Sequence, residues 1–374
     1  MNHQLKLGIL GGGQLGKMLL QVAANYPVVT CVLENDPNCP SAKLCTEFQQ
    51  GNINDFDTVY AFGKKVDVLT IEIEHVNVAA LHQLKKEGLT IIPSPECLEI
   101  IKDKGIQKDF YTKNNIPTSV YFHVENKAAI LAREISFPFV QKINTGGYDG
   151  KGVNVIKSAE DFDKLFDAPS IIEEAIAIKK EIAVIVAVGQ DFSMKAYPPT
   201  EMVFDEKLNL VDYLLSPADI TESLANKAIA IAENVVKALA SPGIFAVELF
   251  LTDADEILVN EIAPRAHNSG HHTIEGNFTS QYDMQMRIFQ RLPLGNTAII
   301  LPAAMLNIIG EDNYEGAAKN DYLQNCLSIA NTYIHLYGKS ISKPGRKMGH
   351  ITTLAANFDE LQNKVSALKI ALKS

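Results

Sequence analysis

The sequence predicts a mixed α/β protein with two or three domains, and three observations support this fold class. A chain of 374 residues exceeds the usual size of a single domain. Near the amino terminus, short apolar runs alternate with helix-like segments, which is typical of α/β units. Farther along, two apolar runs separated by a four-residue turn predict a β-hairpin. An apolar content of 47% and a charged content of 21% fit a globular chain.

The first predicted unit is a strand, Leu5 to Leu10, followed by the glycine-rich turn Gly11 to Gly16. A helix-like segment from Lys17 to Ala24 and a strand from Val28 to Leu33, ending at Glu34, complete it. The glycines permit a tight turn, and a helix N-terminus attracts phosphate. With Glu34 as a ribose partner, the motif fits a nicotinamide-dependent dehydrogenase. The same turn occurs in α/β folds that bind no dinucleotide.

Two further strands, residues 66–73 and 89–92, flank a predicted helix at residues 78–86. Glu72 and Glu74 share one face near the carboxyl end of the first strand, the edge where open α/β sheets bind ligands. Carboxylates there suit an amine or hydroxyl of a substrate, and a solvated edge strand is the competing interpretation. The Pro-Ser-Pro sequence at 93–95 then places a domain boundary near residue 95.

The middle of the chain contains a glycine-rich loop. A helix is predicted over residues 96–114, and the strand Phe139 to Lys142 runs into a loop in which Thr145 to Val153 include four glycines. Backbone amides of such a loop can close over phosphates, as a lid does. The loop lacks the Gly-Lys-Ser/Thr ending of a Walker A sequence. Strands at residues 170–174 and 181–188 follow, and then a helix at residues 220–239.

The predicted hairpin pairs residues 244–251 with residues 256–262 and carries two carboxylates, Glu248 and Glu261. Strand alternation and the four-residue loop place them on one face as diagonal neighbours. Two neighbouring carboxylates repel unless a cation lies between them, and magnesium carrying nucleotide phosphates is the usual solution. Asn260 adjoins this pair, and a polar loop with Arg265 and three other polar residues up to His271 follows.

A basic segment lies near the carboxyl terminus of an otherwise acidic chain. Lys339, Arg346, Lys347 and His350 are close in sequence, in a stretch containing glycine and proline. Such a cluster can hold a ribose 5′-phosphate, with arginine binding in bidentate fashion. An exposed basic loop is the alternative interpretation.

Composition excludes some classes of function. A net charge of −10 argues against general nucleic-acid binding. The sequence contains no apolar run of about twenty residues for a membrane span, and we expect no signal peptide. The five cysteines form no Cys-x-x-Cys pair, which favours reduced thiols and a cytoplasmic location over zinc or a disulfide framework.

Four stretches together resemble the ATP-grasp superfamily and, within it, the N5-carboxyaminoimidazole ribonucleotide synthetase family of purine biosynthesis. They are residues 11–16, 145–152, 260–271 and 344–350, in the family's order. The resemblance implies an ATP-grasp fold in three domains: a Rossmann-like domain at 1–95, a nucleotide-binding domain with the lid at 96–295, and a small C-terminal domain at 296–374. It also implies a homodimer.

The resemblance further implies a reaction and its residues. ATP activates bicarbonate as carboxyphosphate, which carboxylates 5-aminoimidazole ribonucleotide; the cofactors are ATP and Mg²⁺ or Mn²⁺. The implied ATP contacts are Lys104, Lys142, Gly147, Tyr148, Asp149, Gly150, Lys151, Gly152, Val153, Glu173, Glu174, Ala175, Ile176, Glu181, Asn260 and Glu261. The implied metal ligands are Glu248 and Glu261. The implied catalytic residues are Tyr148, Lys151, Arg265, His267 and His271. The implied ribonucleotide contacts are Gln14, Glu72, Tyr148, Lys151, His267, Asn268, Lys339, Arg346 and Lys347.

Three other functions remain open at this stage. A formate-dependent glycinamide ribonucleotide transformylase, or another ATP-grasp ligase, would share the acyl phosphate chemistry and the phosphate clamp. A dehydrogenase would use residues 11–16 and Glu34 and leave the lid and the paired glutamates without a role. A nucleotide sensor without activity would not need the full set of carboxylates and lysines.

Overall fold

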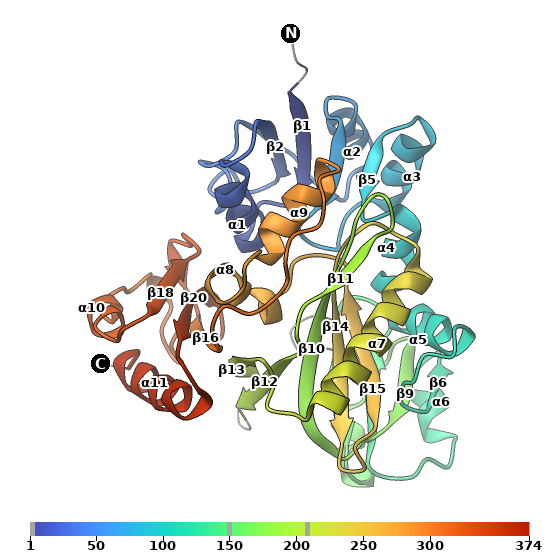
Figure 1. Cartoon of the computed structure of the whole chain (residues 1–374). Coiled ribbons are helices and arrows are strands. Elements are labelled where there is room, and N and C mark those ends of the chain that lie inside the picture. Colours follow the sequence, from blue (N-terminus) through green and yellow to red (C-terminus); the bar gives the residue numbers. More distant parts are fainter. Residues whose placement is uncertain (1–3, 148–151, 206–209, 374) are drawn as a thin grey trace.

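The computed structural model describes residues 4–147, 152–205 and 210–373 (Figure 1). The N-terminal part is a parallel sheet with strand order β3-β2-β1-β4-β5. Its strands are β1 (Leu5–Leu10), β2 (Val28–Glu34), β3 (Glu47–Gln50), β4 (Val68–Ile71) and β5 (Thr90–Ile92). Its helices are α1 (Gln14–Ala23), α2 (Phe56–Gly63) and α3 (Val78–Lys86). The central strands β1 and β4 are almost entirely apolar, as expected of parallel strands covered on both faces.

A small antiparallel sheet follows, with strand order β6-β9-β7-β8. Its strands are β6 (Tyr121–Val124), β7 (Phe139–Ile143), β8 (Val153–Ile156) and β9 (Ser170–Glu174). The helical elements of this part are α4 (Pro95–Lys102), α5 (Lys104–Lys113), α6 (Lys127–Leu131) and η1 (Ala159–Lys164). The single helix predicted over residues 96–114 is therefore wrong. Asp103 adopts an extended conformation between α4 and α5 and caps α5 by accepting a hydrogen bond from the Ile106 amide.

The largest sheet has the strand order β15-β14-β10-β12-β13-β16-β20-β18, with β11 paired to β10. Its strands are β10 (Ile178–Val188), β11 (Met194–Ala196), β12 (Thr200–Asp205), β13 (Leu210–Ser216), β14 (Gly243–Thr252), β15 (Ile257–Ala263), β16 (Ala303–Ile309), β18 (Thr332–Leu336) and β20 (Lys347–Leu354). The C-terminal strands join it where β16 pairs with β13. The middle part of the chain and the C-terminal part therefore share one sheet.

Helices connect these sheets into one molecule (Figure 1). They are α7 (Glu222–Leu239), α8 (Thr273–Gly276), α9 (Gln281–Phe289), α10 (Leu323–Leu327), α11 (Phe358–Ala371) and the short helix η2 (Asn268–Gly270). The short strands β17 (Gly316–Ala317) and β19 (Ile341–Ser342) pair with one another. Helix α7 packs an apolar face that includes Val235 on strands β10 and β14. Helix α9 packs Met284 and Ile288 against the core that includes Leu19 of α1. The observed architecture confirms the predicted mixed α/β class.

Candidate active site

Two glutamates face one another on the β14–β15 hairpin. The prediction that Glu248 and Glu261 are diagonal neighbours is wrong, because Glu248 pairs directly with Glu261. The register shifts between Glu248 and Leu249, which leaves Asn260 as the extra residue of a β-bulge. The bulge brings the two carboxylates closer than regular pairing across a four-residue loop would.

These carboxylates lie in an environment suited to a divalent cation. Lys104 forms an ion pair with Glu261, and its charge holds the pKa of Glu261 well below the usual range. Burial, followed by the charge of Glu261, raises the pKa of Glu248. The positive charges around Glu248 are therefore too few to stabilise its ionised carboxylate, and a bound cation would do so.

The residues present fit Mg²⁺, because Glu248, Glu261 and the Asn260 amide offer only oxygen donors. In the described part of the chain, no cluster of three or more His, Cys, Asp or Glu residues is placed to hold a metal. Nucleotide sites usually bind Mg²⁺ with one or two carboxylates together with phosphate oxygens.

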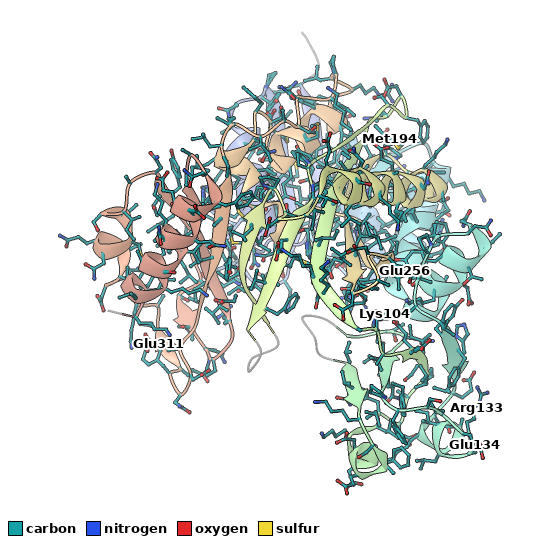
Figure 2. The ribbon with its side chains drawn as sticks, turned by 60° about the horizontal axis from the view of Figure 1, so that its bottom comes forward. Lys104, Arg133, Glu134, Met194, Glu256 and Glu311 are labelled. Carbon is teal, nitrogen blue, oxygen red and sulfur yellow. The ribbon has the colours of Figure 1, made fainter. Side chains whose placement is uncertain are left out.

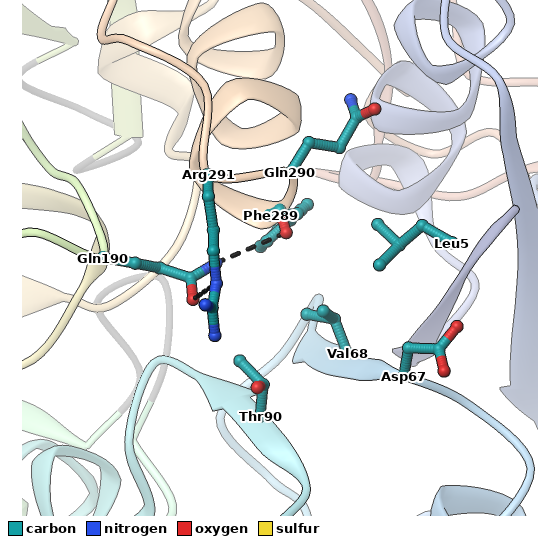
Figure 3. A pocket seen from close by; sticks show the side chains of 8 residues that line it. All are labelled: Leu5, Asp67, Val68, Thr90, Gln190, Phe289, Gln290 and Arg291. Atoms are coloured by element: carbon teal, nitrogen blue, oxygen red, sulfur yellow. Dashed lines mark hydrogen bonds between the residues drawn. The ribbon is translucent and has the colours of Figure 1, made fainter. Parts of the chain in front are cut away.

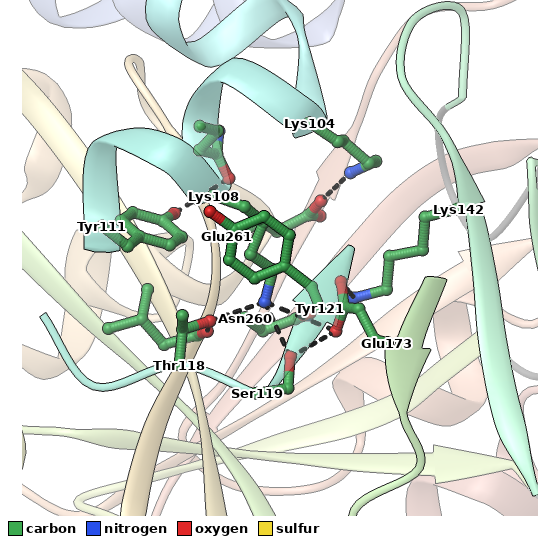
Figure 4. Close-up of polar contacts among 12 residues, drawn as sticks. Lys104, Lys108, Tyr111, Thr118, Ser119, Tyr121, Lys142, Glu173, Asn260 and Glu261 are labelled. Carbon is green, nitrogen blue, oxygen red and sulfur yellow. Dashed lines mark hydrogen bonds and ion pairs between the residues drawn. The ribbon is translucent and has the colours of Figure 1, made fainter. Parts of the chain in front are cut away.

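A second charged cluster lies beside this pair (Figure 4). Lys142 donates to the Asn260 Oδ1 at 2.8 Å, and its Nζ lies 3.1 Å from Glu173 Oε1. Behind it, Lys108 Nζ lies 3.4 Å from the other oxygen of Glu173, which also accepts from Ser119 at 2.6 Å. Burial alone would raise the pKa of Glu173, but the charges of Lys142 and Lys108 outweigh it and lower the pKa.

The expectation that Glu173 reads the adenine therefore needs correction. Its side chain is buried between two lysines, and its backbone lies mid-sheet, opposite Tyr121 on one side and Val140 on the other. Glu174 is exposed, but its amide bonds to the Val120 carbonyl. Ala175 and Ile176 lie in the linker between β9 and β10, where backbone groups can face a base.

Sequence reasoning missed Lys108. It lies one helical turn after Lys104, so the two share one face of α5. That spacing was the available signal, although it does not tell a buried lysine from an exposed one.

Glu181 on β10 lies near Lys142 and Glu261, and their charges affect the pKa of its carboxyl group. Burial raises its pKa to about 7. A half-buried carboxylate at this point fits the expected contact with ribose hydroxyls.

The lid residues are described only at their edges. Gly152 has a φ of +87°, and its carbonyl accepts a hydrogen bond from the Ile143 amide at 2.9 Å. A side chain at Gly152 would collide with Ile143 at 2.7 Å, so glycine is required there. Val153 begins β8, and Gly147 precedes the undescribed part. Tyr148, Asp149, Gly150 and Lys151 lie outside the described residues.

The loop after β15 connects the carboxylates to the N-terminal domain. His267 Nε2 lies 3.4 Å from Glu248 Oε1. The Ser269 amide donates to His267 Nδ1 at 3.3 Å, so Nδ1 is an acceptor and the ring proton of the neutral tautomer lies on Nε2. Arg265 Nε lies 2.8 Å from Glu74 Oε1, and the Asn268 amide donates to Asn307.

His271 does not face this site. Its side chain is fully buried, its Nδ1 contacts Gln281 and Tyr282, and its ring lies 4.7 Å from that of His350. Burial, and then nearby positive charges, hold its pKa well below the usual range, so the ring is neutral. We therefore correct the catalytic assignment of His271 to a packing role, since a ring without exposed surface cannot contact bicarbonate.

Carboxylates of the chain itself occupy the glycine-rich first turn. Glu72 accepts from the amides of Gly13 at 2.8 Å and Leu15 at 3.0 Å, and Glu34 accepts from the Gly12 amide at 3.0 Å. Glu72 therefore caps helix α1; its carboxylate is half-buried and keeps further acceptor positions, so its expected contact with the ribonucleotide stays a prediction. The same bonds argue against a dehydrogenase, because the amides that would bind a pyrophosphate already have anionic partners.

Residues distant in sequence meet at the basic segment. Lys339 donates to Gln14 Oε1 and to the Lys347 carbonyl, both at 2.7 Å. Arg346 is exposed and donates to the Ile341 carbonyl at 2.8 Å. Lys17 donates to the Leu336 carbonyl at 2.6 Å, which ties helix α1 to β18. The structure thus brings the predicted clamp residues Gln14, Lys339 and Lys347 together.

A hollow of about 250 Å³ lies elsewhere (Figure 3). Leu5, Val68 and Thr90, the first residues of β1, β4 and β5, line it together with Arg291, which donates to Gln190 at 2.9 Å. Ligands of open α/β sheets bind at the opposite, carboxyl edge. None of the predicted site residues lines this hollow.

Three family descriptions match successive parts of the chain. The ribonucleotide synthetase preATP-grasp domain matches residues 4–102, the ATP-grasp domain matches residues 109–282, and the phosphoribosylaminoimidazole carboxylase C-terminal domain matches residues 303–364. No helix of the described residues is both long and apolar enough to cross a bilayer.

Proteins of known identity agree with these matches. The chain is 36% identical to the chloroplastic phosphoribosylaminoimidazole carboxylase of Vigna aconitifolia over 98% of its own length, and it spans 67% of that protein. The N5-carboxyaminoimidazole ribonucleotide synthetase of Thermotoga maritima superposes with a TM-score of 0.92 at 39% identity, covering 98% of both chains. The Aspergillus clavatus N5-carboxyaminoimidazole synthase, solved with ADP and 5-aminoimidazole ribonucleotide, gives a TM-score of 0.91 at 34% identity over the whole of both chains.

Proposed function

The chain belongs to the N5-carboxyaminoimidazole ribonucleotide synthetase family of ATP-grasp ligases, and we propose that it carboxylates 5-aminoimidazole ribonucleotide through carboxyphosphate. The observation that supports the route is the opposition of Glu248 and Glu261, with Lys104 and Lys142 beside them. Bicarbonate is a poor electrophile, so its activation requires phosphoryl transfer. Phosphoryl transfer in turn requires positive charge around the transferred group.

In the first half-reaction, a bicarbonate oxygen attacks the γ-phosphorus of ATP. The bond between the γ-phosphorus and the bridging oxygen breaks, and that oxygen leaves with ADP. Lys104 and Lys142 hold the phosphates, and Glu248, Glu261 and Asn260 provide the metal position. When bound, Mg²⁺ would neutralise charge on the transferred group. His267 Nε2 lies 3.4 Å from Glu248 Oε1, beside the metal position, and we assign its N–H as a donor to a bicarbonate or carboxyphosphate oxygen there.

In the second half-reaction, the exocyclic amine attacks the carbonyl carbon, the carbon–oxygen bond to phosphate breaks, and the amine loses a proton. Gln14, Lys339, Arg346 and Lys347 would hold the ribonucleotide, with the basic groups on its 5′-phosphate. Asn268 lies on the loop between the two half-sites. The glycine-rich lid at residues 147–153 would exclude water, which destroys carboxyphosphate.

Other parts of the assignment are proposals of the same kind. We assign Tyr148 and Lys151 of the lid to the reacting groups, and Ala175 and Ile176 to the adenine. We further propose Mg²⁺ or Mn²⁺ as cofactor, a homodimer, a cytoplasmic location and the domain limits 1–95, 96–295 and 296–374. Family membership supports these assignments.

A coupled assay of ADP release tests the proposed reaction. We expect release to require both bicarbonate and 5-aminoimidazole ribonucleotide, and we expect N5-carboxyaminoimidazole ribonucleotide as product. Glycinamide ribonucleotide with formate is the comparison pair. Stimulation by that pair alone would replace the proposed substrate with that of a transformylase and leave the fold unchanged.

A further inference from the structure

The buried lysine Lys108 has no role in the chemistry described above. It lies on α5 with 3% of its side chain exposed. Its ammonium donates to Thr118 Oγ1 at 2.5 Å and to Ser119 Oγ at 2.8 Å, and it lies 3.4 Å from Glu173 Oε2. These three contacts use the three protons of the ammonium group, so Lys108 has no proton left for a nucleotide.

Glu173 is the residue that links Lys108 to the site. Each oxygen of its carboxylate faces a different lysine, Lys108 at Oε2 and Lys142 at Oε1. Lys142 is the more accessible, with 11% of its side chain exposed, and it also contacts Asn260 beside the metal position. Figure 4 shows the two lysines on either side of the carboxylate.

Nucleotide binding changes the balance of this cluster. A phosphate bound by Lys142 would compete with Glu173 for its charge and so weaken the contact between Lys142 and Glu173. A buried carboxylate that loses its only cation is strongly destabilised. With Lys108 in place, Glu173 keeps one cation and the hydrogen bond from the Ser119 hydroxyl after Lys142 has moved.

We propose that Lys108 is a positioning residue for ATP binding: its ammonium group is held against Glu173 by contacts apart from the nucleotide site, which leaves Lys142 free to bind phosphate. This role rests on the proposed contact between Lys142 and ATP. It assigns Lys108 no contact with substrate. It also explains why the structure buries an anion beside a site that binds anions, because the Glu173 charge is compensated on the side away from the nucleotide.

The test compares Lys108→Met with the double variant Lys108→Met/Glu173→Gln. In the single variant, Lys142 is the one cation among the described residues that still forms an ion pair with Glu173, so Glu173 competes with phosphate for it. We expect the KM for ATP and the Kd for ADP to rise about tenfold or more, equivalent to about 1.4 kcal/mol, while kcat stays within about twofold. In the double variant the competing charge is absent, so ADP affinity should return to within about threefold of the wild type.

Lys113→Met, an exposed change on the same helix, is the matched control, and its ADP affinity should equal that of the wild type. A Kd for ADP in Lys108→Met within twofold of the wild type would overturn the proposal. So would a double variant that folds without recovering ADP affinity, because a purely structural role predicts no rescue. If Lys108→Met does not fold, the double variant decides alone.

Direct ADP binding separates this inference from the proposed reaction. Absence of ribonucleotide-dependent ADP release by the wild type would refute the reaction and leave the binding comparison valid. Normal turnover of the wild type with unchanged ADP binding by Lys108→Met would refute only the role of Lys108.

Discussion

Replacing Glu261 by glutamine should abolish most magnesium-dependent turnover while barely changing stability. In the metal-free protein, the change removes both the ion pair with Lys104 and the repulsion from Glu248. These effects oppose one another, and the Glu261 side chain is 40% exposed, so the free energy of unfolding should change by about 1 kcal/mol or less. In the nucleotide complex, the metal position loses one of two carboxylates. Removing one preorganised electrostatic group typically costs about 2.7–4 kcal/mol, or roughly 10²–10³ in kcat.

The assay is ADP release at saturating ATP, bicarbonate and 5-aminoimidazole ribonucleotide, with MgCl₂ titrated, beside a melting curve of each protein. Glu256→Gln in the exposed hairpin loop is the matched control and should behave as the wild type. Figure 2 labels Glu256 at that hairpin and Lys104 near the small antiparallel sheet. If Glu261→Gln turns over at a near wild-type rate with an unchanged magnesium midpoint, the metal assignment is refuted.

Three further changes test other parts of the site. Because the pKa of Glu181 is raised to about 7, its carboxyl group becomes ionised as the pH rises from about 6 to about 8, and ADP affinity should rise over the same range. The Glu181→Gln variant should keep only the pH dependence that comes from the nucleotide itself. Equal pH profiles of ADP affinity in the two proteins would reject the ribose contact. Lys339→Ala should raise the KM for the ribonucleotide about tenfold or more and leave the KM for ATP unchanged. The control Lys343→Ala, which removes an exposed partner of Glu315, should change neither KM. An unaltered ribonucleotide KM in Lys339→Ala would show that the 5′-phosphate site has been assigned to the wrong residues. His267→Ala should lower kcat about a hundredfold with a small change in substrate KM, measured by steady-state kinetics, and a rise in KM alone would indicate a binding role instead.

The sequence predicted most of the elements because their signals are local. Strand β1 and helix α3 have the predicted limits, since apolar runs and turn residues follow the chain itself. The shared face of the two carboxylates on the β14–β15 hairpin was likewise readable, because side chains alternate along a strand. The break at Asp103 was not read, although aspartate is a favoured N-cap residue.

The site depended on information that the sequence pattern does not contain. Alternation gives only the face of a strand, so the bulge at Asn260 changed a diagonal pair into a direct one. Glu72 and His271 have residue types that suit catalysis, yet one caps a helix and the other packs in the interior. Whether a carboxylate meets substrate or backbone depends on which segments pack around it, and those segments lie far away in the chain.

The amino-acid order thus determined the fold class, the hairpin with its two carboxylates, the glycine-rich segment proposed as a lid and the basic segment near the end. Tertiary packing determined which charges meet: Gln14 with Lys339, Arg265 with Glu74, and Glu173 with two lysines. Local patterns follow from backbone geometry, whereas burial and ion pairing are properties of the assembled sheets. Only the assembled sheets show that Lys108, one turn from Lys104, is buried behind the nucleotide site.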